Sequence, residues 1–232
     1  GLMQRAAKSI QSGQTIFERK SSKGDLKNIR YMFIDEYQDF SDLFLKLIEA
    51  TRAQNDKIEF FCVGDDWQAI NGFAGSDLQF YDNFHQYFSP SCQLYISTNY
   101  RSSKAIVAVG NSLMYGLGKP ADANKGDTGT ILLGSLDEFK PTNRENERHS
   151  GDEITPAVLR LVSKLLGTDK SVVLLSRKNT LPWYVNYSAI KSHKKNGLDA
   201  FCDLIRSYFP EELRARISTS TAHKYKGLQN DA

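Results

Sequence analysis

The stretch Tyr31-Met32-Phe33-Ile34-Asp35-Glu36-Tyr37-Gln38-Asp39-Phe40 joins a short apolar run to a cluster of acidic residues. A run of this length with aromatic and β-branched residues is typical of a strand in a parallel sheet that is covered on both faces. Open α/β sheets bind their ligands beyond the carboxyl ends of their strands. The sequence therefore predicts that Asp35 and Glu36 lie at a ligand-binding edge of a parallel sheet.

The pair Asp35 and Glu36 is suited to magnesium-dependent hydrolysis of a nucleotide. Mg²⁺ is usually held by one or two carboxylates together with substrate phosphates, a role that fits Asp35. Glu36 could then orient or deprotonate the attacking water. An Asp-Glu pair is also common in solvated acidic loops, so the dipeptide alone leaves both interpretations open.

Composition indicates a soluble globular protein of one large domain or two modest ones. The chain has 232 residues, of which 40% are hydrophobic and 25% are charged. It contains no signal peptide and no apolar run of about 18 residues that would mark a membrane span. Its three cysteines, at 62, 92 and 202, lack a CxxC spacing, which predicts reduced thiols in a cytoplasmic protein. The net charge of +3 is too small to indicate nucleic-acid binding by the whole surface, so such binding would need a local groove.

Helix and strand patterns alternate along the chain. Helices are expected over residues 2–10, 43–48, 105–113 and 154–166, and strands over 31–34, 58–63, 92–96, 130–133, 172–175 and near Ile217. Ser41 offers an N-cap to the second helix. Polar loops are expected before residue 31 and over residues 140–153. This alternation predicts an α/β fold with a parallel sheet.

A second polar loop, Gly64–Asp77, follows the strand expected at 58–63. Its three glycines allow the backbone to approach a ligand closely. Gln68 could place its amide beside a phosphate oxygen. Phe73 could stack on a nucleic-acid base, a contact worth about 1 to 3 kcal/mol. Trp67 and Phe73 could equally be core aromatics.

A third motif, Asn99-Tyr100-Arg101-Ser102-Ser103, follows the apolar segment 92–96. The guanidinium of Arg101 has a planar fork that matches a phosphate, as in an arginine finger. Tyr100 could stack on a purine, or it could be an ordinary interface tyrosine. Alone, this pair of residues is weak evidence for a nucleotide site.

The fourth motif, Ser218–Gln229, lies almost at the end of the chain. Its hydroxyls, together with His223, Lys226 and Gly227, suit contacts to a phosphate backbone or to a ribose. A lone histidine is more often a surface residue, so His223 carries weight only with its neighbours. The basic run at 191–195 could also contact phosphates, but it is equally explained as a solvated surface.

Taken in this order and spacing, the four motifs closely resemble those of the UvrD/Rep-type superfamily 1 helicases, and most of all the helicase IV branch. The first resembles the Walker B motif, and the second resembles the motif that couples ATP to DNA. The third and fourth resemble the adenine and γ-phosphate motif and the late DNA and ribose motif. The resemblance implies an α/β fold of two RecA-like parallel-sheet motor domains of the P-loop NTPase class, the first incomplete.

The resemblance also implies an ATP site. Asp35 would hold Mg²⁺ and Glu36 would be the catalytic base. Gln68 and Arg101 would contact the γ-phosphate, and Tyr100 would stack on adenine.

The same resemblance implies the remaining contacts to ATP and to DNA. Phe73 would stack on DNA, and His223 and Lys226 would contact it. Gly227 belongs to the ATP-binding set, and Gln229 stands where relatives carry a ribose-binding glutamate. Gln229 is a departure, but its amide can still bond a hydroxyl, which predicts softer nucleotide selectivity. Ala74 departs too, standing where many relatives have an arginine, which puts coupling to DNA in doubt.

Two elements of the family pattern are missing from the sequence given. It contains no Gly-x-x-x-x-Gly-Lys-[Ser/Thr] phosphate loop, because Gly116–Pro120 lacks the spacing and the hydroxyl. No final arginine motif follows Ser218–Gln229. We therefore expect a fragment, with residues 1–97 as the rear part of the first motor domain (1A). Residues 98–232 would form most of the second (2A), without a large 2B insertion.

These motifs predict part of an ATP-dependent helicase that moves 3′ to 5′ on single-stranded or partly duplex DNA. The family uses ATP and Mg²⁺, and the helicase segments outside this sequence would be the partners. The sequence given predicts no ATPase activity of its own, because the phosphate loop is absent. The alternatives are a non-catalytic remnant that binds DNA or protein, and a helicase coupled to a nuclease.

Overall fold

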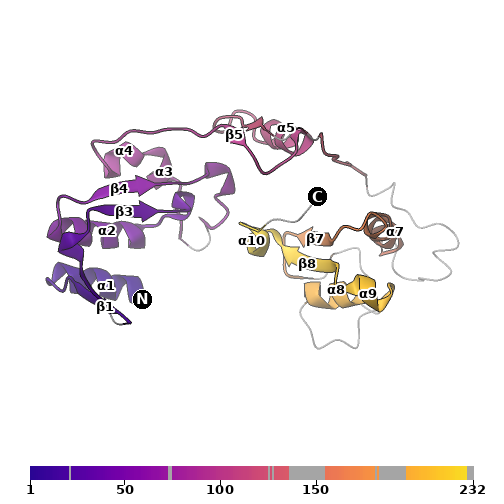
Figure 1. Ribbon diagram of the computed structural model, residues 1–232, viewed down its shortest axis with the longest axis horizontal. Coiled ribbons are helices and arrows are strands. Elements are labelled where there is room, and N and C mark those ends of the chain that lie inside the picture. Colours follow the sequence, from indigo (N-terminus) through magenta and orange to yellow (C-terminus); the bar gives the residue numbers. More distant parts are fainter. Residues whose placement is uncertain are drawn as a thin grey trace. The chain divides into compact units, whose positions relative to one another are not determined.

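The computed structural model describes residues 1–20, 22–72, 75–124, 126, 128–135, 155–180, 182 and 197–228. It divides into two compact units, Gly1–Asp127 and Thr128–Ala232 (Figure 1). This division falls later in the chain than the expected boundary between residues 97 and 98. The assignment of residues to two motor domains stays a prediction.

The first unit opens with the elements that carry the acidic loop. They are α1 (Leu2–Gln11), β1 (Ile16–Arg19), β2 (Ser22–Asp25), β3 (Tyr31–Ile34), α2 (Asp42–Gln54) and β4 (Glu59–Cys62). The two helices and the strands β3 and β4 confirm the sequence prediction, and Ser41 is the N-cap of α2 as expected. The loop expected before residue 31 is partly wrong, because β1 and β2 form an antiparallel hairpin. The two strands of this hairpin are paired through their backbones. None of its described side chains is buried, and even Ile16 is 70% exposed.

Strands β3 and β4 are parallel neighbours, as Figure 1 shows, with Phe33 paired to Phe61 and Ile34 to Cys62. One face of the pair packs into an aromatic-rich core, whose buried members are Tyr37, Phe40, Ile48, Phe80 and Phe88. The opposite face carries exposed aromatic side chains at positions 31, 33 and 61. The alternation follows from the two-residue period of a strand. It also differs from the expected strand buried on both faces.

The rest of the first unit consists of short elements. They are α3 (Gln79–Asp82), α4 (Phe84–Tyr87), β5 (Thr98–Asn99), α5 (Lys104–Leu113) and β6 (Asp122–Ala123). Helix α5 confirms its prediction, whereas the strand expected at 92–96 is wrong. The apolar side chains there are not buried, with Leu94 85% and Ile96 89% exposed. Strand pairing begins only at Thr98, where β5 runs parallel to β6.

The second unit has its own core. Its described elements are α7 (Thr155–Leu166), β7 (Val172–Ser176), α8 (Gly197–Ser207), α9 (Glu211–Arg214), β8 (Ile217–Thr221) and α10 (Ala222–Tyr225). Strands β7 and β8 are parallel, from Val172 opposite Ile217 to Ser176 opposite Thr221. The buried core residues are Val162, Leu166, Val172, Ala200, Phe201, Ile205 and Ile217.

Helix α7, strand β7 and the strand near Ile217 confirm their predictions. The strand expected at 130–133 is wrong, because Leu132 and Leu133 are 77% and 90% exposed and belong to no strand. The loop expected at 140–153 lies outside the described residues. The fold is therefore mixed α/β, and the parallel sheets in its described part are small pairs.

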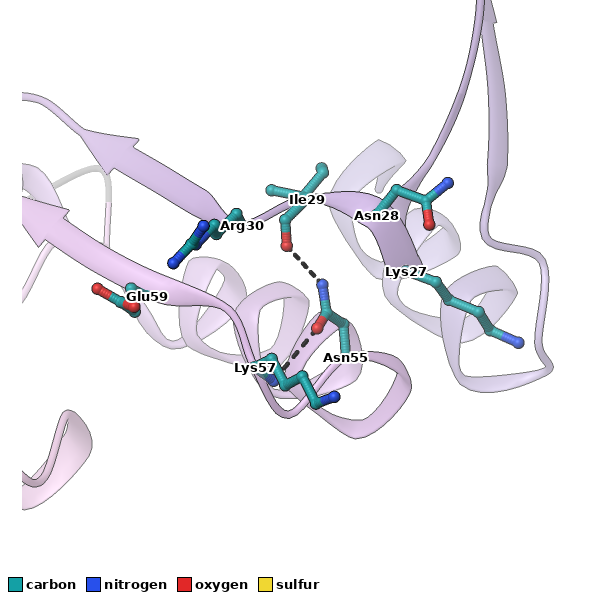
Figure 2. A pocket seen from close by; sticks show the side chains of 7 residues that line it. All are labelled: Lys27, Asn28, Ile29, Arg30, Asn55, Lys57 and Glu59. Atoms are coloured by element: carbon teal, nitrogen blue, oxygen red, sulfur yellow. Dashed lines mark hydrogen bonds between the residues drawn. The ribbon is translucent and has the colours of Figure 1, made fainter.

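The amino ends of β3 and β4 are joined by the buried side chain of Asn55. Its amide nitrogen donates to the carbonyls of Leu26 and Ile29 at 3.0 and 2.6 Å, and its oxygen accepts from the Lys57 amide at 3.2 Å. Figure 2 shows the bonds of Asn55 to Ile29 and Lys57 in a pocket that is lined by Lys27, Asn28, Ile29, Arg30, Asn55, Lys57 and Glu59. The pocket lies at the opposite end of the strands from Asp35 and contains none of the predicted site residues.

No helix in the described part of the chain combines the length and the apolar character needed to cross a membrane.

Candidate functional site

The acidic loop and the Gly64–Asp77 loop leave the same edge of one sheet. Because β3 and β4 are parallel, their carboxyl ends lie together, and Ile34 pairs with Cys62 at this end. Two further backbone bonds continue the contact beyond the strands. The Val63 amide donates to the Ile34 carbonyl at 2.9 Å, and the Tyr37 amide donates to the Val63 carbonyl at 2.8 Å. The local sequence thus delivers carboxylates from both strands to one edge.

Asp35 is exposed at the start of the acidic loop. Its Oδ1 accepts a hydrogen bond from the Glu36 amide at 2.9 Å, which orients the carboxylate. A hard cation that keeps several waters and takes one or two protein carboxylates suits this donor. Asp35 therefore fits the predicted Mg²⁺ ligand in its chemistry. No group of three or more His, Cys, Asp and Glu side chains suited to a metal occurs in the described part of the chain.

Glu36 occupies a left-handed backbone conformation, with φ 54° and ψ 43°. This region costs a residue other than glycine about 1 to 3 kcal/mol, so the surrounding structure must hold it there. The conformation starts a 3₁₀ turn over Tyr37–Asp39. As a result the ring of Tyr37 enters the core, while Glu36 stays exposed.

Gln38 joins the two loops through its buried side chain, which is only 1% exposed. Its Nε2 donates to Oε2 of Glu36, and its Oε1 accepts from the Asp65 amide at 2.9 Å. No role for Gln38 was predicted from the sequence. The acidic motif contains Gln38, but the sequence does not indicate that its partner is Asp65 in the second loop.

Gly64 leaves the space that Gln38 occupies. A Cβ at position 64 would lie 2.8 Å from Oε1 of Gln38 and 3.0 and 3.1 Å from the amides of Gln38 and Tyr37. A side chain at position 64 would therefore displace either Gln38 or the backbone of the acidic loop. The sequence predicted that this glycine allows a close approach to the backbone. In the structure the atoms that approach it belong to Gln38 and Tyr37.

Three further contacts hold the loops together. Nδ2 of Asn71 donates to Oδ2 of Asp39 at 2.9 Å. The Asp77 amide donates to the Phe40 carbonyl at 3.0 Å, and an isolated bridge pairs Ser41 with Ser76. Among the described residues, the two loops are therefore connected at several points from Tyr37 to Ser41.

Gln68 lies on the same connected edge. Asp65 caps the 3₁₀ turn Asp66–Gln68 by accepting the Trp67 amide at 3.1 Å, and its other oxygen accepts Nε2 of Gln68 at 2.7 Å. Gln68 is exposed, so its amide can exchange this partner for a ligand. Glu36 and Gln68 are linked through Gln38 and Asp65.

Trp67 is partly exposed, and Nε1 of its indole donates to the Leu117 carbonyl at 2.6 Å. The neighbouring Gly118 has a φ of +71°, and a Cβ there would lie 2.8 Å from Nε1 of Trp67. Trp67 thus anchors the turn after α5. This differs from the core aromatic that the sequence suggested for Trp67.

Tyr81 is a further neighbour that the sequence analysis did not identify. Its hydroxyl lies 3.5 Å from the Gly64 carbonyl. Burial raises the pKa of Tyr81, and the negative charges of Asp66 and Asp65 raise it further. Tyr81 therefore stays a neutral phenol beside these carboxylates at physiological pH. Burial also raises the pKa of the Cys62 thiol to about 12, as expected for a packing residue.

Tyr100 and Arg101 are exposed on the turn that follows β5. Oδ1 of Asn99 accepts the amides of Arg101 and Ser102 at 3.0 and 2.8 Å, which shapes the turn before Ser103 begins α5. None of the hydrogen bonds among the described residues connects this turn with Asp35 or its loop. The roles of Tyr100 and Arg101 stay predictions.

In the second unit, β8 delivers the fourth motif to the short helix α10. Oγ1 of Thr221 caps this helix by accepting the Lys224 amide at 3.3 Å. His223 is exposed and Lys226 partly exposed, and Gly227 ends the turn with a φ of +79°. Phe73, Ala74 and Gln229 lie outside the described residues, so their roles also stay predictions.

Comparisons with known proteins agree on one family. A model described as the UvrD/REP helicase N-terminal domain matches residues 3–89. DNA helicase IV of Escherichia coli (strain K12) is 34% identical over 114 residues, which cover 47% of this chain and 16% of that protein. A probable DNA helicase of Mycoplasma pneumoniae is 24% identical over 208 residues, 89% of this chain and 35% of the relative. The Rep helicase of Salmonella typhimurium is 29% identical over 146 residues, 63% of this chain and 20% of the relative.

The chain therefore spans 16% to 35% of the length of these relatives. The family match contains β3, β4 and both loops of the candidate site. The part of this chain that carries the candidate site, residues 3–89, is thus similar to the N-terminal domain of the UvrD/REP helicases.

Proposed function

We propose that this chain is the part of an ATP-dependent DNA helicase that carries the hydrolytic carboxylates. The observation that carries the proposal is the connected edge of β3 and β4. There Glu36 and Gln68 lie at the two ends of one hydrogen-bonded series through Gln38 and Asp65. Acid–base catalysis and phosphate sensing need groups held in a fixed relation, which such a series supplies.

In this proposal Asp35 holds Mg²⁺, which would neutralise charge on the phosphates of ATP. Glu36 orients and deprotonates the attacking water. Gln68 leaves Asp65 to bond the γ-phosphate. Each role uses a group that is exposed at the edge of the sheet.

The other contacts are proposed from the motifs. Arg101 would bond the γ-phosphate and Tyr100 would stack on adenine, with Gly227 and Gln229 near the nucleotide. Phe73, His223 and Lys226 would contact single-stranded or partly duplex DNA.

The whole protein would contain two RecA-like motor domains, and the 1A segment would end and the 2A segment begin near residue 97. ATP would bind in the cleft between these motor domains. ATP-driven closure and reopening would move the protein 3′ to 5′ in the cytoplasm. This requires a phosphate loop from a segment outside the sequence given.

The test compares residues 1–232 with an extended protein that includes a phosphate loop encoded upstream of Gly1. Steady-state ATP hydrolysis is measured with Mg²⁺ and single-stranded DNA. We expect turnover in the extended protein and none in residues 1–232. Glu36→Gln should abolish turnover, and the matched control Glu49→Gln on the exposed side of α2 should leave it unchanged.

Turnover that survives Glu36→Gln would refute the assignment of the base. DNA binding without hydrolysis by the extended protein, or a reading frame without a phosphate loop, would instead support a non-catalytic remnant.

A further inference from the structure

We propose that Gln38 is a positioning residue that sets the Glu36 carboxylate and couples it to the Gln68 loop. The inference rests on the proposed function, because it takes Glu36 as the base. It adds a residue to that site, one that acts through Glu36 rather than on the nucleotide.

The chemistry of its partners determines the orientation of the Gln38 amide. Oε1 faces the Asp65 backbone amide, which can only donate, and Nε2 faces the Glu36 carboxylate, which accepts when ionised. With the amide reversed, Nε2 would face the Asp65 amide, donor against donor. Oε1 would face the Glu36 carboxylate, acceptor against acceptor. The side chain therefore has one satisfied orientation, and one oxygen of Glu36 is fixed by it.

Burial makes this arrangement stiff. Gln38 is 1% exposed, so its side of both hydrogen bonds is shielded from water. Because Gly64 has no Cβ, Oε1 of Gln38 has room to approach the second loop.

Asp65 extends the series to the predicted phosphate sensor. Its amide binds Gln38, and its carboxylate binds the Trp67 amide and Nε2 of Gln68. A phosphate that draws Gln68 away from Asp65 removes one of the bonds that hold this turn. Since the same residue holds Gln38, the position of Glu36 depends on whether Gln68 is engaged.

The first experiment measures ATP hydrolysis by the extended protein with Gln38→Met, which keeps the length of the side chain and removes both hydrogen bonds. We expect kcat to fall about 10- to 100-fold, because a small displacement of a catalytic group has effects of that size. The KM for ATP should be unchanged. The matched control is Gln79→Met, because Nε2 of the exposed Gln79 also bonds a carboxylate two residues away, on Asp77 at 2.7 Å.

A second variant, Gln38→Glu, keeps an acceptor for the Asp65 amide but replaces the donor to Glu36 by a second carboxylate, which repels it. In residues 1–232, hydrogen exchange should show the Asp65 amide protected in Gln38→Glu and unprotected in Gln38→Met. Turnover of the extended protein should fall in both variants.

A double-mutant cycle separates positioning from a purely structural role. In a Glu36→Gln background, measured by single turnover, Gln38→Met should have no further effect on the rate. An undiminished effect there, or unchanged kcat in both Gln38 variants, would overturn the inference while leaving Glu36 as the base. Full activity of Glu36→Gln alone would refute the proposed function itself.

Discussion

The pairs β3–β4 and β7–β8 have the same architecture but different loops at their carboxyl ends. Each pair consists of two parallel strands, and each leads into a polar motif. After β3 and β4 the loops carry carboxylates and are tied to each other by side chains. After β8 the motif carries hydroxyls and basic groups, and Thr221 caps its own helix.

The loops at the carboxyl ends of the two strand pairs thus carry different chemical groups, held in different ways. The proposed hydrolysis would require groups held to within about 0.5 Å, and a buried residue such as Gln38 at the first edge meets that requirement. Contacts to a phosphate backbone depend mainly on charge, which the exposed His223 and the partly exposed Lys226 can supply. The two edges thus match the proposed division between ATP hydrolysis and DNA binding.

The largest expected effect tests whether the second edge depends on its own core. Ile217 begins β8 and is 0% exposed. Ile217→Ala should lower the free energy of unfolding of the second unit by about 2 to 5 kcal/mol, because it leaves a cavity. Hydrogen exchange resolved by unit measures this, with the 90% exposed Leu133→Ala as control. If hydrogen exchange in β3 and β4 accelerated as much as in β7 and β8, the two strand pairs would not have independent cores, and the comparison would fail.

Gly64→Ala tests the tight contact between the loops of the first edge. The new Cβ would lie 2.8 Å from Oε1 of Gln38. The free energy of unfolding should fall by about 1 to 3 kcal/mol, as for other overpacked sites. Urea denaturation checks this against Gly72→Ala, where the added Cβ meets no atom within 4 Å. If both substitutions have the same small effect, the first edge is as loosely built as the second.

Thr221→Ala asks how much the cap contributes at the second edge. Loss of an N-cap side chain costs about 0.5 to 2 kcal/mol. Exchange of the Lys224 amide should accelerate, whereas the loops after β3 and β4 should be unaffected. The exposed Ser218→Ala on the same strand is the control. An unchanged Lys224 amide would show that the backbone alone holds this turn.

The smallest expected effect concerns pH. The pKa of Tyr81 is raised in the folded protein, so its contribution to stability is complete below the unfolded value of about 10. That contribution is lost as the pH rises toward the folded value. Thermal unfolding between pH 9 and 11 should therefore show a smaller alkaline loss in Tyr81→Phe than in the unmodified protein. An identical loss in both would mean that neither burial nor the charges of Asp66 and Asp65 raise the pKa of Tyr81.

Local patterns were sufficient for part of the fold and of the site. The strand at 31–34 and the helix that begins after Ser41 were predicted correctly, because their spacing and end residues act over a few positions. The runs at 92–96 and 130–133 have the same apolar character, yet they form no strand. A strand requires a partner, and sequence periodicity does not show whether one is available.

The sequence by itself determined which chemical groups this protein carries and the family that residues 3–89 resemble. The order of strand, acidic loop and helix followed from it as well. Only the tertiary structure decided that Gln38 joins Glu36 to Asp65 and that Asn71 bonds Asp39. These bonds connect residues about thirty positions apart. They depend on the parallel register of β3 and β4, which sets which atoms meet at the edge of the sheet.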